Sequence, residues 1–145
     1  MKINVLIVED CSVMRLLISR TLKLSGHEIG DITEAENGVE GLKYLKEKSI
    51  DLVIIDINMP VMDGLEMLEM MRKDPQTKRI PVLTVSTESN TKRVEFISKL
   101  SSGFVHKPFT PETLKKNFLK VLKEQPITQT AASYALDISK NGRSR

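Results

Sequence analysis

The chain lacks most of the residues that point to a membrane protein, a disulfide-bonded scaffold or a secreted protein. It has no tryptophan and a single cysteine, Cys11, in 145 residues. An internal disulfide is therefore impossible, and a reducing compartment, the cytoplasm, is expected. No apolar run approaches the roughly 18 residues needed to span a bilayer, so no membrane insertion is expected. The first residues reach an acid at Glu9 without the long apolar segment of a secretory signal, and we expect none.

A strong excess of charge of one sign is also missing. The net charge is +3, and residues 125–145 hold three of the 22 basic and one of the 19 acidic residues, a net of +2. The remaining 19 basic and 18 acidic residues leave a nearly neutral body with a net charge of +1, which does not suggest nucleic-acid binding. The hydrophobic pattern stops near Pro126. We therefore expect one domain over residues 1–124 and a flexible C-terminal extension over residues 125–145.

Strand-like and helix-like segments alternate along the first 124 residues. Short apolar runs predict strands, and apolar residues repeated at three- and four-residue spacing predict helices. The expected strands cover residues 5–8, 29–35, 52–56, 81–86 and 103–106. The expected helices contain residues 14–22, 39–48, 65–71, 91–100 and 111–122. Ser12 is the expected cap of the first helix and Thr110 that of the last.

These five βα units predict an α/β fold with helices on both faces of a doubly wound, five-stranded parallel sheet. Residues 5–8, 52–56 and 81–86 are apolar on both faces, as central strands are. The second and fifth strands are more polar and suit the edges. The pattern fits the order 2-1-3-4-5 of flavodoxin-like sheets, which bind ligands where the order reverses, between the first and third strands.

Charged residues follow three of these strands. Glu9 and Asp10 come directly after the first strand, Asp56 ends the third, and Lys107 follows the fifth. Because the carboxyl ends of parallel strands lie at one edge of the sheet, these four side chains are expected to converge. Three carboxylates and one ammonium in a crevice predict a site for a cation and a phosphoryl group.

The acidic cluster predicts a hard divalent cation. Two carboxylates about 4 Å apart repel each other by roughly 4 kcal/mol at an effective dielectric constant near 20. Oxygen ligands suit Mg²⁺, which binds one or two carboxylates, several waters and a phosphate. The chain has no His and Cys set with zinc spacing. Since a dianionic phosphoryl donor would otherwise meet three negative groups, we expect an absolute requirement for Mg²⁺.

An ordered set of short motifs resembles the signature of the response-regulator receiver domain. Its members are Val8-Glu9-Asp10, Asp56-Ile57-Asn58-Met59-Pro60 with Met62-Asp63-Gly64, Val85-Ser86, and Lys107-Pro108-Phe109. The set covers about residues 3 to 124 and is most similar to the stand-alone, CheY-like members, which are a standard example of the strand order given above. The resemblance implies a signalling switch of a two-component system that catalyses its own phosphorylation and dephosphorylation, rather than an enzyme acting on an external substrate.

The resemblance also implies which residues bind the phosphoryl group and the metal. Asp56 would be the phosphoacceptor, a carboxylate nucleophile that takes a phosphoryl group from a phosphohistidine. Asp10, Asp56 and the backbone carbonyl of Asn58 would bind Mg²⁺ directly. Glu9 would hold the ion mainly through water.

Further residues would complete and transmit the signal. Lys107 would pair with the phosphoryl oxygens, and Ser86 would donate a hydroxyl hydrogen bond to one of them. Phe104 matches the aromatic switch position on the fifth strand. It would rotate inward once the Ser86 hydroxyl moves towards the phosphoryl group, which changes the surface of the fourth helix, fifth strand and fifth helix.

The positions two residues after the phosphoacceptor and two after Ser86 tune dephosphorylation in this family. Here they are Asn58 and Glu88, both of which resemble fast-hydrolysing chemotaxis receivers. Thr87 departs from the small residue that usually follows the Ser or Thr. Its bulk would shield the phosphoryl group, which leaves the lifetime open.

The pathway and two rival classes of protein stay open. A histidine kinase or phosphotransfer protein would supply the phosphoryl group. The output partner would be a flagellar motor switch protein in chemotaxis, or a phosphotransfer domain in a phosphorelay. A haloacid-dehalogenase-like phosphatase also uses an aspartate after a strand, but it needs a second acid where this chain has Asn58. A flavodoxin-like FMN carrier needs a glycine- and hydroxyl-rich loop where Glu9 and Asp10 would repel phosphate.

Overall fold

The computed structural model describes residues 1–124 and contains five strands and five helices in strict alternation. The strands are β1 (Ile3–Val8), β2 (Ile29–Ala35), β3 (Leu52–Asp56), β4 (Val82–Ser86) and β5 (Gly103–His106). The helices are α1 (Ser12–Lys23), α2 (Gly38–Glu47), α3 (Gly64–Lys73), α4 (Thr91–Leu100) and α5 (Pro111–Glu124). The extension predicted for residues 125–145 lies outside the described residues.

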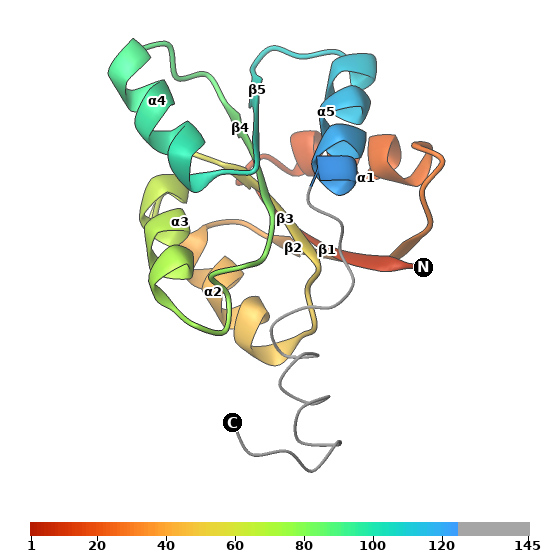
Figure 1. Ribbon diagram of the computed structural model, residues 1–145, viewed down its shortest axis with the longest axis horizontal. Coiled ribbons are helices and arrows are strands. Elements are labelled where there is room, and N and C mark those ends of the chain that lie inside the picture. The colour runs from red at the N-terminus through yellow and green to blue at the C-terminus, as the bar shows by residue number, and fades with distance from the viewer. Residues whose placement is uncertain (125–145) are drawn as a thin grey trace.

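All neighbouring strands are parallel, and their order is β2-β1-β3-β4-β5, so the predicted fold class and strand order are confirmed. Figure 1 shows the sheet between two helical layers, with α1 and α5 on one side and α2, α3 and α4 on the other. The order reverses at β1, whose neighbours are β2 and β3. The carboxyl ends of β1 and β3 therefore border the crevice in which such sheets bind ligands.

Alternation along the strands explains why the central runs are apolar on both faces. Val5 and Ile7 of β1 belong to the core under α1 and α5, whereas Leu6 and Val8 belong to the core under the other three helices. All four side chains are fully buried. Burying each such side chain stabilises the folded state by about 1.5–3 kcal/mol relative to leaving it exposed. The central strands therefore hold the residues that follow them in fixed positions.

Side-chain caps fix the starts of most helices. Asn37, Asp63 and Asn90 accept hydrogen bonds from the backbone N–H groups at the starts of α2, α3 and α4. Thr110 accepts from the Thr113 N–H at 3.1 Å, as predicted.

The predicted Ser12 cap is wrong. Cys11, with extended backbone, occupies the N-cap position of α1 without a side-chain cap bond, and Ser12 is already helical. The Cys11 N–H is instead bound to the Glu9 carboxylate at 3.1 Å, which ties the start of α1 to the acidic turn. Among residues 1–124, no helix combines the length and apolar character that crossing a bilayer requires.

Candidate phosphoryl and metal site

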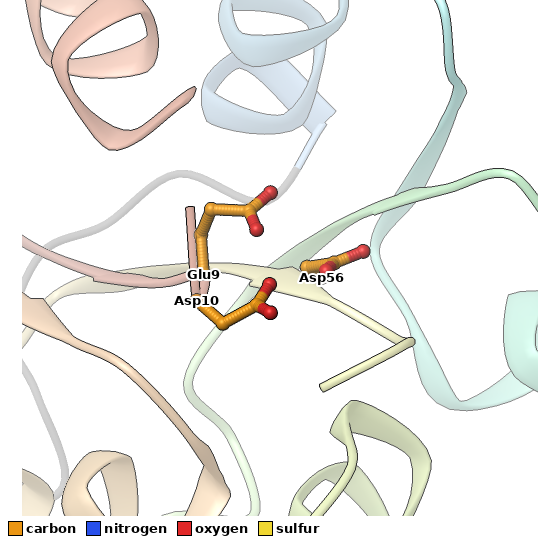
Figure 2. Close-up of side chains that lie close together, drawn as sticks. All are labelled: Glu9, Asp10 and Asp56. Carbon is orange, nitrogen blue, oxygen red and sulfur yellow. The ribbon is translucent and has the colours of Figure 1, made fainter. Parts of the chain in front are cut away.

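The three acids predicted to converge do so at the carboxyl ends of β1 and β3. Figure 2 shows Glu9 and Asp10 beside Asp56, with the Asp10 carboxylate turned towards Asp56. One ligand oxygen from each residue can be chosen so that all three lie within 4.8 Å of one another. Glu9 and Asp56 are buried and Asp10 is exposed, so the group opens to solvent through Asp10.

Lys107 brings the positive charge into this group. Its Nζ lies 2.6 Å from Oε1 of Glu9 and 3.4 Å from Oδ1 of Asp56. Its backbone N–H donates to the carbonyl of Ser86 at 2.8 Å, and this bond holds the Lys107 backbone next to the end of β4. The peptide bond to Pro108 is cis. In this state the ammonium bridges the two carboxylates and is closer to Glu9 than to Asp56.

Burial dominates the electrostatics of the two inner carboxyls. It raises the pKa of Asp56, although the charge and hydrogen bond of Lys107 act in the opposite direction. It also raises the pKa of Glu9 against the same lysine. Burial disfavours the Lys107 ammonium too, but its bonds to Glu9 and Asp56 outweigh this and raise its pKa. The shifts agree physically because one ammonium is shared by two carboxylates that also repel each other.

When a chelator removes divalent cations, the free energy of unfolding of the protein is expected to fall as the pH rises above 3.8, the ordinary pKa of Asp. Folded Asp56 keeps its proton where the unfolded chain has lost it, so folding binds a proton and the free energy of unfolding falls with rising pH. Urea unfolding of the wild type and of Asp56→Asn, carried out from below this pKa up to neutral pH, measures how the free energy of unfolding of each protein depends on pH. Near neutral pH the free energy of unfolding of the variant should exceed that of the wild type, and the difference should shrink as the pH falls towards 3.8. Parallel curves for the two proteins would contradict the assignment.

The donor set fits Mg²⁺. It consists of carboxylate oxygens without His or Cys, all within 4.8 Å of one another, and oxygen ligands are those that Mg²⁺ prefers. Both oxygens of Glu9 are already engaged, one by Lys107 and one by the Cys11 N–H. Asp10 and Asp56 are therefore better placed than Glu9 to contact an ion directly.

The loop after Asp56 returns tightly to the end of β3. The Gly64 N–H donates to the carbonyl of Ile57 at 2.8 Å, and a Cβ at Gly64 would overlap the carbonyl oxygen of Asp56. Glycine is therefore required at this close approach. Val61, at the outer turn of the loop, has a φ of 69°, which is costly for a β-branched residue. The loop that contains Asn58 is thus held in a constrained conformation.

The β4–α4 loop borders the site on the side of β3 that faces away from β1. Ser86 is fully buried, and its Oγ accepts from the Glu88 N–H at 2.9 Å, which leaves its own hydrogen for another acceptor. The Glu88 carboxylate pairs with Arg93 of α4 at 2.6 Å, and this bond lowers the Glu88 pKa. Asn58 Nδ2 donates to Thr87 Oγ1 at 3.2 Å, so the β3–α3 loop contacts the β4–α4 loop. Sequence reasoning missed Arg93, which no motif singled out.

Phe104 of β5 is half-buried and packs against the core under α2, α3 and α4. Its ring centroid lies 4.8 Å from that of His106, two residues along the same strand. The ring is thus partly inserted, at the boundary between core and surface.

The strand order, together with the three acids at the place where that order reverses, defines a flavodoxin-like α/β protein of the CheY type. The family described as the response regulator receiver domain matches residues 5–119. A chemotaxis protein CheY homolog of Campylobacter jejuni is 38% identical over 123 residues, and the match covers 82% of this chain and 92% of that protein. Chemotaxis protein CheY1 of Helicobacter pylori is 39% identical over 82% of this chain and 96% of its own length.

A solved structure gives the same result. The chemotaxis response regulator CheY4 of Vibrio cholerae superposes with a TM-score of 0.74 at 34% identity, over 84% of this chain and 100% of that one. The chain therefore belongs to the response regulator receiver domain family, which decides against the phosphatase and flavin-carrier alternatives. CheY-type receiver domains act as signalling switches, and receiver domains bind Mg²⁺ at an acidic pocket.

Proposed function

We propose that this protein is a single-domain response regulator of a two-component phosphorelay, in which phosphorylation of Asp56 switches a protein-binding surface. One observation carries the proposal: the buried Asp56 carboxylate lies 3.4 Å from the Lys107 ammonium and beside the Glu9–Asp10 pair. The donor would be the phosphohistidine of a histidine kinase or phosphotransfer protein. Residues 1–124 would form the receiver domain and residues 125–145 an extension, in a cytoplasmic protein.

Each side chain has a part in the transfer. An Asp56 carboxylate oxygen attacks phosphorus, while the histidine nitrogen leaves with the electrons of the broken P–N bond. Mg²⁺ held by Asp10, Asp56 and the Asn58 carbonyl would neutralise phosphoryl charge, with Glu9 acting through water. Lys107 would move from Glu9 towards the phosphoryl oxygens, which its present position between Glu9 and Asp56 allows.

The rim residues connect the site to α4. If the Ser86 Oγ moves towards a phosphoryl oxygen, the bond that it accepts from the Glu88 N–H has to rearrange, and Glu88 is tied to Arg93 of α4. Water reaching the phosphoryl group would pass the contact between Asn58 and Thr87. These residues, with Glu88, would therefore set the lifetime of the phosphorylated state.

Phe104→Ala is expected to uncouple phosphorylation from the α4–β5 surface. The ring is half-buried, so it can gain core contacts when Ser86 moves, and alanine cannot. Amide hydrogen exchange in α4 should differ between the phosphorylated and unphosphorylated wild type, and most of this difference should vanish in the variant. Phe96→Ala, which removes an exposed ring from α4, is the control. An undiminished difference in Phe104→Ala would disprove the switch.

The direct test of the proposed function uses the purified protein with Mg²⁺ and acetyl phosphate. Intact mass should increase by one phosphoryl group, and peptide mapping should place it on Asp56. A protein that gains no mass, while a known receiver treated in parallel does, would contradict the proposal.

Chemotaxis is the pathway we favour, with a flagellar motor switch protein as the output partner. The support is the similarity to chemotaxis CheY proteins of two organisms. The second candidate is an intermediate in a phosphorelay, whose output partner would be a histidine phosphotransfer domain. Pull-down with phosphorylated protein separates the two, because a motor component favours the first and a phosphotransfer domain the second.

A further inference from the structure

Arg15 of α1 reaches back to the turn that carries the acid pair. Its Nη1 donates to the backbone carbonyl of Glu9 at 2.6 Å, and its Nε donates to Oε1 of Glu34 at 2.8 Å. Only 12% of the Arg15 side chain is exposed, against 47% for Glu34. Glu34 lies near the end of β2, so one guanidinium joins α1, the β1–α1 turn and the edge strand.

The bonded carbonyl belongs to the peptide group that joins Glu9 to Asp10. On its amino side this turn is held by the bond from the Glu9 N–H to the Ala35 carbonyl at 3.0 Å, and the Glu9 carboxylate is held by Cys11 and Lys107. Asp10 is exposed at the rim, so the direction of its side chain depends on the orientation of that peptide group. A charged donor makes a stronger bond than a neutral one, and a planar guanidinium fixes two bonds at once.

We infer that Arg15 is a positioning residue for the divalent cation. It acts through the Glu9–Asp10 peptide, which it locks so that the Asp10 carboxylate stays turned towards Asp56 (Figure 2). The inference rests on the proposed metal site. It adds that the affinity of the site depends on a residue that supplies no ligand atom and carries the same sign of charge as the ion.

The sign of the charge makes the inference testable. If Arg15 acted only through its positive charge, removing it would strengthen cation binding, and replacing it with lysine would change nothing. If it acts by positioning, both replacements weaken binding, because lysine has one donor group where the guanidinium makes two directed bonds. Loss of a residue that orients a metal ligand costs about 10–100-fold in affinity in other proteins.

The experiment is calorimetric titration of the full chain with Mg²⁺, without any phosphodonor. We expect Kd to rise about tenfold in Arg15→Ala and by a smaller, several-fold factor in Arg15→Lys. Arg20→Ala, which removes an exposed arginine from the last turn of the same helix, should bind like wild type. Thermal unfolding in chelator checks that each variant is folded. Should Arg15→Ala fail to fold, Arg15→Lys, with unchanged charge, still distinguishes the two explanations.

A second measurement separates positioning from catalysis. In phosphorylation by acetyl phosphate, Arg15→Lys should need several-fold more Mg²⁺ for half-maximal rate and reach the wild-type rate at saturation. Unchanged or tighter Mg²⁺ binding in both Arg15 variants, or a reduced rate at saturating Mg²⁺, would overturn the inference. A wild-type protein that binds no Mg²⁺, or an Asp10→Asn variant that binds it equally well, would contradict the proposed metal site instead.

Discussion

Asp56→Asn is expected to gain no phosphoryl group from acetyl phosphate in the presence of Mg²⁺, under conditions in which the wild type is phosphorylated. The substitution keeps the size of the side chain but replaces the nucleophilic carboxylate oxygen with an amide, which does not attack phosphorus. In the wild type Lys107 also pairs with Glu9 at 2.6 Å, a bond that does not involve Asp56, so the variant should keep this ion pair. The measurement is intact mass after incubation, and the expected signal is background.

Asp51→Asn is the matched control for this experiment. Asp51 is the residue before β3, at the opposite end of the strand from Asp56; it is also a buried carboxyl whose pKa is raised by burial. Its carboxylate accepts from the Asn4 N–H at 2.7 Å, and within residues 1–124 it forms no salt bridge with a lysine. The control should be phosphorylated like wild type. Full phosphorylation of Asp56→Asn would move the acceptor to another acid and remove the basis of the proposed function.

The convergence of Glu9, Asp10, Asp56 and Lys107 could be predicted from the sequence because it depends on backbone topology alone. Apolar runs locate the strands, and parallel strands place whatever follows them at one edge. Neither step requires a side-chain conformation. The same reasoning placed the polar segments of residues 29–35 and 103–106 at the edges of the sheet, where the structure has β2 and β5.

What sequence reasoning missed depends on side-chain direction. Arg15 is one of several basic residues on a helix, and only the structure shows that its guanidinium turns back to the Glu9 carbonyl. The Ser12 cap was wrong because the helix begins one residue earlier: the Arg15 N–H donates to the Cys11 carbonyl, which makes Cys11 the N-cap. The Cys11 N–H is itself bound from upstream, by the Glu9 carboxylate. A hydrogen-bonded turn can satisfy a helix start from upstream, and a local capping pattern does not contain that information.

Hydrogen bonds and ion pairs connect the acidic site to other elements of the fold in two directions. Towards β2 and α1, the Glu9–Asp10 turn is held by Arg15, which is paired with Glu34. Towards α4, Ser86 holds the Glu88 backbone, and the Glu88 side chain holds Arg93. The first connection would hold the proposed metal ligands in place. The second contains the groups that would rearrange if the Ser86 Oγ moved towards a phosphoryl group, as proposed above.

Removal of divalent cations is expected to abolish phosphorylation of Asp56. In excess EDTA, a dianionic donor meets three carboxylates with one ammonium among them. At about 4 Å each uncompensated pair of charges costs roughly 4 kcal/mol at an effective dielectric constant near 20, and every 1.4 kcal/mol is about tenfold in rate. The expected decrease is therefore at least about 10²-fold.

Acidification is not expected to replace the metal. Because burial raises the pKa of Asp56, lowering the pH protonates the nucleophile itself while it relieves the repulsion. Mass should be measured after incubation with acetyl phosphate in EDTA from neutral to mildly acidic pH, with Mg²⁺ added back in excess to one portion of each sample. Re-addition should restore the mass gain near neutral pH. A phosphoryl group on Asp56 in excess EDTA would show that Lys107 alone supplies enough positive charge, and the requirement for a metal would be disproved.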